Sequence, residues 1–132
     1  MRYMLDSNIC IYIINRKPQP VLSKLNDKRH EGLAISAITL AELEHGISLS
    51  EHQEKNRNSL SQFLAIIDVL DFDVDAAHTY GDIRASLQRK GQLIGPLDLL
   101  IAAHAKSKGL ILVTNNTDEF SRVDGLSLEN WV

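Results

Sequence analysis

The stretch MRYMLDSNICIYIIN, residues 1–15, places three polar residues, Asp6, Ser7 and Asn8, between two apolar runs. The first run, residues 2–5, predicts a short buried β-strand, and the second, residues 9–14, predicts a short helix that stops before Pro18. An acid at such a junction either caps the helix or holds a cation. Because Asn8 would cap the helix equally well, capping alone does not explain Asp6.

The rest of the chain repeats this alternation of short apolar runs with longer segments of helical periodicity. Strands are predicted at residues 33–36, 69–72 and 110–113, with an edge strand at 127–131. Helices are predicted at residues 39–48, 58–67, 75–90 and 96–108, and the last two each stop at a glycine. This order predicts parallel crossovers, and therefore an α/β sandwich with a parallel sheet. No repeat or linker divides the chain, so residues 1–132 are expected to form one domain.

Composition limits the classes of function. The chain has 132 residues, a formal charge of −3, 44% hydrophobic residues and 23% charged residues, values typical of a globular protein without an overall basic surface for nucleic acid. The absence of a membrane-length apolar run or a recognisable signal peptide predicts a cytoplasmic protein with no membrane contact. The single cysteine, Cys10, lies in an apolar run and is expected to be a buried thiol.

Acidic residues recur beyond the ends of the predicted strands. Asp6 follows the first strand, Glu42 lies near the start of the helix after the second strand, and Asp98 lies in the first turn of the helix that opens at Pro96. Residues 114–116, Thr-Asn-Asn, follow the strand at 110–113. In an open parallel sheet these positions share one rim. Carboxylates gathered there repel one another unless a cation binds, and oxygen ligands without a His or Cys cluster favour Mg²⁺ or Mn²⁺ over zinc.

Each of these residues also has a purely structural interpretation. Residues 39–42, TLAE, fit a capping box in which Glu42 binds the backbone at the start of its own helix. Asp98, at the third helical position, would interact favourably with the helix dipole. Asn116 fits a cap for the short segment after it, and Glu119 fits a solvated acid. The coincidence of the positions on one rim favours a metal site over separate caps.

Other kinds of site are disfavoured. The acidic run at residues 71–75 begins like a calcium loop, but the glycine and glutamate that such a loop needs are missing. The chain has no phosphate-binding glycine loop, no metalloprotease histidine pair and no nucleophile-elbow serine. Three basic residues precede the segment that contains Asp98; they would suit an RNA backbone or simply form a solvated helix end: Arg84, Arg89 and Lys90.

Four segments together resemble the PIN-domain ribonucleases, and closely the VapC toxins of bacterial toxin–antitoxin pairs: MLDSNI at 4–9, ISAITLAELEHG at 35–46, GPLDLLIAAHA at 95–105 and LVTNNTDEF at 112–120. The resemblance implies a PIN-like α/β/α sandwich with a central parallel sheet, and Mg²⁺-dependent cleavage of RNA that inhibits translation and growth. It assigns Asp6, Glu42 and Asp98 as catalytic and metal-binding acids, and places Asn116 and Glu119 in a more variable fourth region. Ser7 stands where threonine is usual, and Asn116 stands where many relatives have aspartate.

The resemblance also implies partners. It predicts a VapB-type antitoxin, an RNA substrate with a tRNA anticodon loop as the expected target, a homodimer within the toxin–antitoxin complex, and DNA contact only through the antitoxin. The helix pair within residues 39–67 is expected to provide much of the antitoxin groove, because its apolar residues exceed what one helix face needs. As a mechanism, Asp6 and Asp98 would bind Mg²⁺, with Mn²⁺ able to substitute, while Glu42 orients or deprotonates the attacking water.

Two rival functions make different demands on the same rim. A phosphotransfer receiver domain also gathers acids around Mg²⁺, but it needs paired acids after the first strand and a lysine after a late strand. This chain has Asp6-Ser7 and Thr114-Asn115 at those places. A non-catalytic binding module whose acids only cap helices would show no response to added Mn²⁺.

Overall fold

The structure is a computed structural model that describes residues 1–132. One sheet of five parallel strands has the order β3-β2-β1-β4-β5, and its strands are β1 (Tyr3–Leu5), β2 (Leu33–Ser36), β3 (Asp68–Leu70), β4 (Ile111–Val113) and β5 (Leu128–Glu129). The chain starts at the centre of the sheet, adds β2 and β3 on one side, and then returns to add β4 and β5 on the other. The connections that leave β1 and β4 therefore run in opposite directions from two neighbouring strands.

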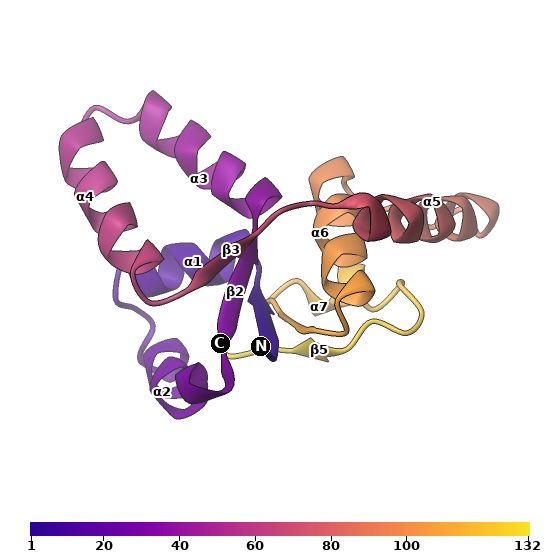
Figure 1. Ribbon diagram of the computed structural model, residues 1–132, viewed down its shortest axis with the longest axis horizontal. Helices are drawn as coiled ribbons and strands as arrows, with labels where there is room; N and C mark the ends of the chain where they lie inside the picture. Colours follow the sequence, from indigo (N-terminus) through magenta and orange to yellow (C-terminus); the bar gives the residue numbers. More distant parts are fainter.

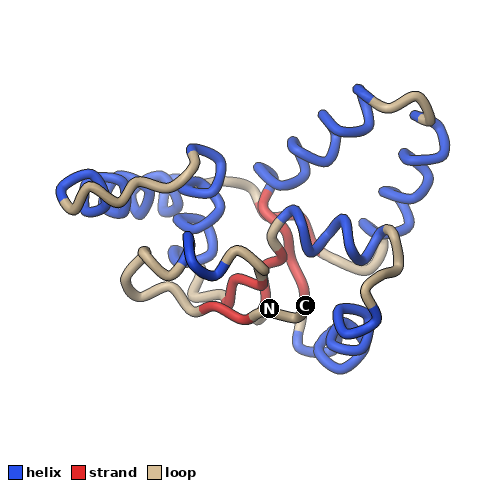
Figure 2. Tube along the Cα trace, turned by 180° about the vertical axis from the view of Figure 1, so that it is seen from behind, coloured by secondary structure: helices blue, strands red, loops and turns tan.

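Two groups of helices cover the two faces of the sheet (Figure 1). The first group is α1 (Ser7–Ile14), α2 (Gln19–Lys28), α3 (Ala37–Leu49) and α4 (Gln53–Leu64), with a 3-10 turn at Arg29–Glu31. The second group is α5 (Val74–Arg89), α6 (Pro96–Ser107) and α7 (Thr117–Phe120). Seen from behind in Figure 2, the strands lie between the two groups and the chain ends lie side by side. The predicted α/β/α sandwich with a central parallel sheet is confirmed.

Alternate residues of each central strand belong to different cores. Tyr3 and Leu5 pack with the first group of helices, whereas Met4 between them packs with the second, as the two-residue period of a strand requires. All three side chains are almost fully buried, which explains why β1 reads as a continuous apolar run. Cys10 is buried in the first core, as predicted. No helix combines the length and apolar content needed to cross a membrane.

Most bounds shift by one to three residues, and the largest differences from the predicted elements are in two helices. No helix was predicted between Pro18 and the second strand, yet α2 occupies Gln19–Lys28 with only Val21 and Leu25 buried. Its apolar stripe is too sparse to give a clear helical period, and the proline in its first turn starts the helix instead of preventing it. Helix α4 begins at Gln53, five residues before the predicted start at 58, because its first turn is polar and exposed.

Candidate functional site

Asp6 lies at the junction of β1 and α1 and is only 5% exposed. Its Oδ1 accepts a hydrogen bond from the Ser7 backbone N–H (2.8 Å), and its Oδ2 accepts one from Thr114 Oγ1 (2.8 Å). Because Thr114 follows β4, this contact spans the point where the connections diverge, which is the usual ligand site of an open α/β sheet. A typical N-cap accepts from the second or third amide of its helix, whereas Asp6 accepts from the first, and Asn8 lies inside α1.

Glu42 does not take part in a capping box. Helix α3 begins at Ala37, directly after β2, and its cap is Ser36, whose Oγ accepts from the Ile38 N–H at 3.1 Å. Glu42 is therefore the sixth helical residue, beyond the turn whose amides need caps. Its Oε1 accepts a hydrogen bond from Ser7 Oγ at 2.8 Å. The contact joins α3 to the β1–α1 junction and brings Glu42 beside Asp6.

Asp98 and Glu119 meet at the start of α6. A Cβ built on Gly95 would lie 3.4 Å from Asp98 Oδ2 and 3.6 Å from Glu119 Oε1, and each of the two carboxyl groups shifts the pKa of the other. Glu119 is held by the Gly95 N–H, which donates to Oε1 at 2.8 Å, and by the side-chain amide of Asn116, which donates to Oε2. Asn116 makes no side-chain cap to α7. The capping interpretation of Asn116 and the solvated interpretation of Glu119 are therefore both wrong.

The pKa values show that these acids act on one another. Burial, followed by the charges of Glu119, Asp6 and Glu42, raises the pKa of Asp98 to about 7. Asp98 also lies in the first turn of α6, where the helix dipole favours the ionised carboxylate, so burial and the neighbouring acids act against the dipole. Burial also raises the pKa of Asp6. The Gly95 amide holds the pKa of Glu119 below its ordinary range, so Glu119 is the ionised partner of Asp98.

The donor chemistry of this site fits a hard divalent cation. Four carboxylates contribute only oxygen atoms, which suits Mg²⁺ and Mn²⁺, and none of the four forms an ion pair with a basic side chain: Asp6, Glu42, Asp98 and Glu119. Gly95 leaves open the space beside two of them that a side chain would fill. As they stand, no three His, Cys, Asp or Glu side chains form a group that could hold a metal ion.

The basic residues predicted to bind RNA have other contacts in the structure. Arg84 donates from Nη1 to Tyr80 Oη at 2.9 Å, and Lys90 pairs with Asp124 at 3.0 Å. Arg89, in the last turn of α5, forms no ion pair. None of the three has its charge among the causes that shift the pKa values of the acidic site. Their role in RNA binding stays a prediction.

Sequence reasoning missed Arg122 as a residue of this region. Its positive charge contributes to the lowered pKa of Glu119, and its Nη1 donates to the Leu93 carbonyl at 3.1 Å. Leu93 belongs to the loop that leads to Gly95 and α6. The only signal in the sequence was an arginine placed three residues after Glu119, just beyond a short helix.

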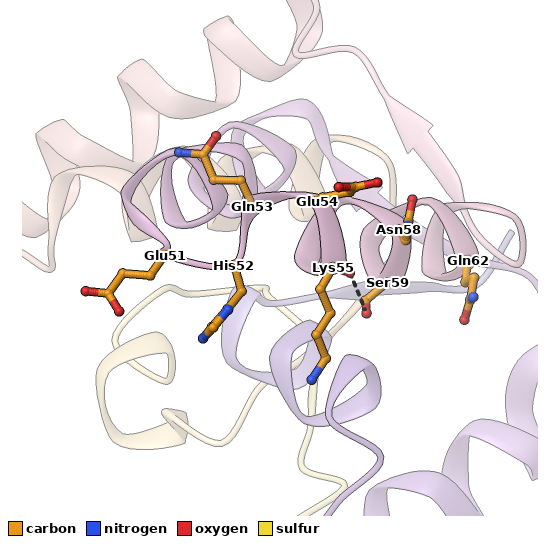
Figure 3. A pocket seen from close by; sticks show the side chains of 8 residues that line it. All are labelled: Glu51, His52, Gln53, Glu54, Lys55, Asn58, Ser59 and Gln62. Atoms are coloured by element: carbon orange, nitrogen blue, oxygen red, sulfur yellow. Dashed lines mark hydrogen bonds between the residues drawn. The ribbon is translucent and has the colours of Figure 1, made fainter.

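Two of the hollows on the surface lie on the side of the helices α1, α3 and α4. One of about 630 Å³, at the start of α4, is lined by eight residues, none of them hydrophobic. In Figure 3 their side chains point in different directions, and Ser59 Oγ donates to the Lys55 carbonyl, so this hollow has no convergent catalytic groups. The other, about 230 Å³, is an apolar groove between α1, α3 and α4, and Glu42 lines it together with Ile11, Ile14, Asn15, Leu43, Gly46, Ile47, Asn56 and Leu60.

A parallel sheet of this order, with acids gathered where its connections diverge, is the architecture of the PIN domain, and the PIN domain family model matches residues 3–126. The chain is 47% identical over 131 residues to the tRNA(fMet)-specific endonuclease VapC of Shigella flexneri, covering 99% of this chain and 98% of that protein. It is 46% identical to ribonuclease VapC2 of Haemophilus influenzae, covering 100% and 99%.

Solved structures agree with these relatives. VapBC2 from Rickettsia felis, bound to a promoter DNA fragment, superposes with a TM-score of 0.95 at 43% identity and full coverage of both chains. DNA-bound VapBC from Salmonella typhimurium superposes with a TM-score of 0.94 at 42% identity, covering 100% of this chain and 99% of that one. The chain therefore belongs to the PIN-domain family and, within it, to the VapC ribonucleases of VapBC toxin–antitoxin systems. PIN-domain nucleases depend in general on divalent metal ions.

Proposed function

We propose that this chain is a cytoplasmic toxin that uses Mg²⁺ to cleave a tRNA within its anticodon loop, and so stops translation and growth. The observation that carries the proposal is the convergence of four carboxylates, from the β1–α1 junction, α3, α6 and α7, with no basic side chain paired to any of them. A cluster of this kind needs a cation, and a bound cation next to a phosphodiester is the basis of metal-assisted hydrolysis.

Asp6 and Asp98 would hold the metal, with Glu119 as a further ligand. The ion, when bound, lowers the pKa of water and offsets the charge of the phosphate. Thr114 and the Ser7 amide fix the carboxylate of Asp6. Ser7 Oγ fixes one oxygen of Glu42, which leaves the other to accept a proton from the attacking water. Attack by water instead of the ribose 2′-hydroxyl leaves 3′-hydroxyl and 5′-phosphate ends.

The relatives support tRNA as the substrate class. The protein from Shigella flexneri and one from Salmonella typhimurium, at 47% and 43% identity, are both named tRNA(fMet)-specific endonucleases. A single-stranded loop suits such a site, because its bases and backbone can be splayed out for contact. Initiator tRNA is therefore the first substrate to assay.

A VapB-type antitoxin would occupy the apolar groove between α1, α3 and α4. The groove is lined by apolar residues of all three helices and also by Glu42, so a chain bound there lies against the catalytic acids. Exposed apolar side chains mark the same helices, with Ile11 43% exposed and Leu49 74% exposed. The homologous structures are VapBC complexes bound to DNA, which supports a complex with an antitoxin that contacts DNA. Within that complex we expect the toxin to be a homodimer.

Sequencing RNA ends after brief induction of the chain tests the activity. New 5′-phosphate ends within one anticodon loop, growth arrest, and recovery with a co-expressed antitoxin are the expected results. Undisturbed growth and unchanged RNA ends, with the folded protein confirmed in the cells, would refute the function.

Gly46 offers a matched test of the groove. No atom lies within 4 Å of a Cβ built on Gly46 or on Gly81, but only Gly46 lines the groove. Replacing either by leucine removes a helical glycine, which should stabilise the helix by roughly 1 kcal/mol. Gly46→Leu should abolish antitoxin binding while Gly81→Leu preserves it. Equal binding by both variants in calorimetry would place the antitoxin elsewhere.

A further inference from the structure

Arg122 lies just beyond α7 with its side chain exposed at the edge of the acidic site. One of its N–H groups donates to the Leu93 carbonyl. A guanidinium carries five N–H donors in a rigid plane, so this contact leaves most of them available to a ligand. The Arg122 backbone N–H donates to the Glu119 carbonyl at 3.2 Å, so the arginine is held next to one of the four site acids.

Two lysines extend the positive charge away from Arg122. Lys106 Nζ donates to the Asp124 carbonyl at 2.7 Å, and Lys90 Nζ pairs with Asp124 Oδ2 at 3.0 Å. Arg122, Lys106 and Asp124 line a hollow of about 230 Å³, in which Asp82 is the other acid. Two basic and two acidic side chains line this hollow, and Arg122 is the lining residue that lies nearest in sequence to Glu119 of the acidic site, apart from it by three residues.

An RNA strand that approaches four carboxylates is repelled unless cations flank them. A bound metal ion would offset the charge of the phosphate that is cut, but the charges of the neighbouring phosphates must be offset by basic side chains of the protein. Arginine suits this task, because its planar fork binds two phosphate oxygens at once.

We propose that Arg122 is an RNA-contacting residue of this nuclease, whose guanidinium binds a substrate phosphate beside the acidic site while its Nη1 anchors the loop at Leu93. The inference rests on the proposed RNA cleavage and adds a substrate-binding residue to it. The alternative is a purely structural arginine that only anchors the loop.

The test separates charge from anchoring. Arg122→Gln removes the charge and keeps an amide donor for the Leu93 carbonyl, whereas Arg122→Lys keeps the charge. Arg57→Gln is the matched control, because Arg57 is an exposed arginine of α4 paired with Glu44. The probe is a fluorescein-labelled RNA hairpin with the anticodon arm of initiator tRNA, and its Kd is measured in EDTA, where no cleavage occurs, from about 50 to 200 mM NaCl.

Loss of one phosphate contact should reduce the slope of log K against log salt by about 0.7 to 0.9 and weaken binding roughly three- to tenfold at low salt. Arg122→Gln should show this loss, and Arg122→Lys and Arg57→Gln should keep the original slope. An unchanged slope in Arg122→Gln, even with slower cleavage, would leave only the anchoring role and overturn the proposal. The proposal would also be overturned if Arg57→Gln reduced the slope as much as Arg122→Gln does, or if Arg122→Lys reduced it. If the original protein neither binds the hairpin in EDTA nor cleaves it in Mg²⁺, the RNA function itself fails with it.

Discussion

Asp98→Asn should stabilise the metal-free protein, and the gain should grow with pH. The pKa of Asp98 is about 7 in the folded chain, against an ordinary value of 3.8, so ionising it costs more in the folded state than in the unfolded state. Its contribution to stability is complete below about pH 4 and is lost as the pH rises through about 7. Asparagine has the same shape and does not ionise, so the variant avoids this loss.

The size of the gain follows from the shift. Three pKa units would correspond to about 4 kcal/mol. Asp98 is only half-buried, so solvent screens its interactions, and the favourable shift of Glu119 offsets part of the penalty. A gain of about 1 to 2 kcal/mol in the free energy of unfolding at pH 8 remains. For a chain of this length that is a rise of roughly 3 to 8 °C in Tm.

Adding Mg²⁺ should make the original protein more stable than Asp98→Asn, the reverse of the order in EDTA. At a Mg²⁺ concentration a hundred times its Kd, the original protein gains about 2.7 kcal/mol, which exceeds the advantage of the variant, whereas Asp98→Asn lacks a charged ligand and should gain much less. Cleavage of tRNA should fall more than the roughly 10- to 100-fold seen when a partner of a metal ligand is lost. Antitoxin binding should survive, because Asp98 does not line the apolar groove.

The assay is thermal melting in EDTA and in excess Mg²⁺ at pH 5 and pH 8, followed by cleavage of initiator tRNA. Asp75→Asn is the matched control, since Asp75 is an exposed acid in the first turn of α5. Losing a helix-start acid should cost that control about 0.3 to 1 kcal/mol, with its response to Mg²⁺ intact. If Asp98→Asn behaves like the control, melting lower in EDTA and still cutting RNA, then Asp98 is not a metal ligand.

Three further substitutions test how the site is held. Ser7→Ala removes the donor that fixes Glu42. The kcat for RNA cleavage should fall roughly 3- to 30-fold, while the free energy of unfolding drops by only about 0.5 to 1.5 kcal/mol. Unchanged kinetics would show that the contact has no role in cleavage. Ser36→Ala removes the cap of α3 and should lower the free energy of unfolding, measured by chemical denaturation, by about 1 to 2 kcal/mol. Ser36→Thr keeps a capping hydroxyl and should retain most of that stability. Asn116→Ala releases one donor from Glu119, so the Mg²⁺-induced rise in Tm should shrink; an undiminished rise would exclude Glu119 as a further ligand.

Local patterns were sufficient to predict the strands of the sheet. Residues 33–36 were predicted and observed as a strand without change, and the start of α6 at Pro96 was also correct. The continuous apolar run of β1 and the helical spacing of apolar residues in α5 are properties of consecutive residues, so they are visible in a single chain. The same local information placed Asp6 and Asp98 at the ends of their elements, and the four segments that contain the site residues identified the family.

The contacts that define the site were decided by tertiary structure. Thr114 and Asp6 are 108 residues apart, and Gly95 and Glu119 are 24 apart; their meeting depends on the order of the strands, which no local period encodes. The roles of Glu42 and Asn116 were equally undecided, because a capping residue and a site residue have the same sequence signature until the helix start is known. Sequence therefore determined which residues stand on the rim, and packing of the sheet decided which of them touch.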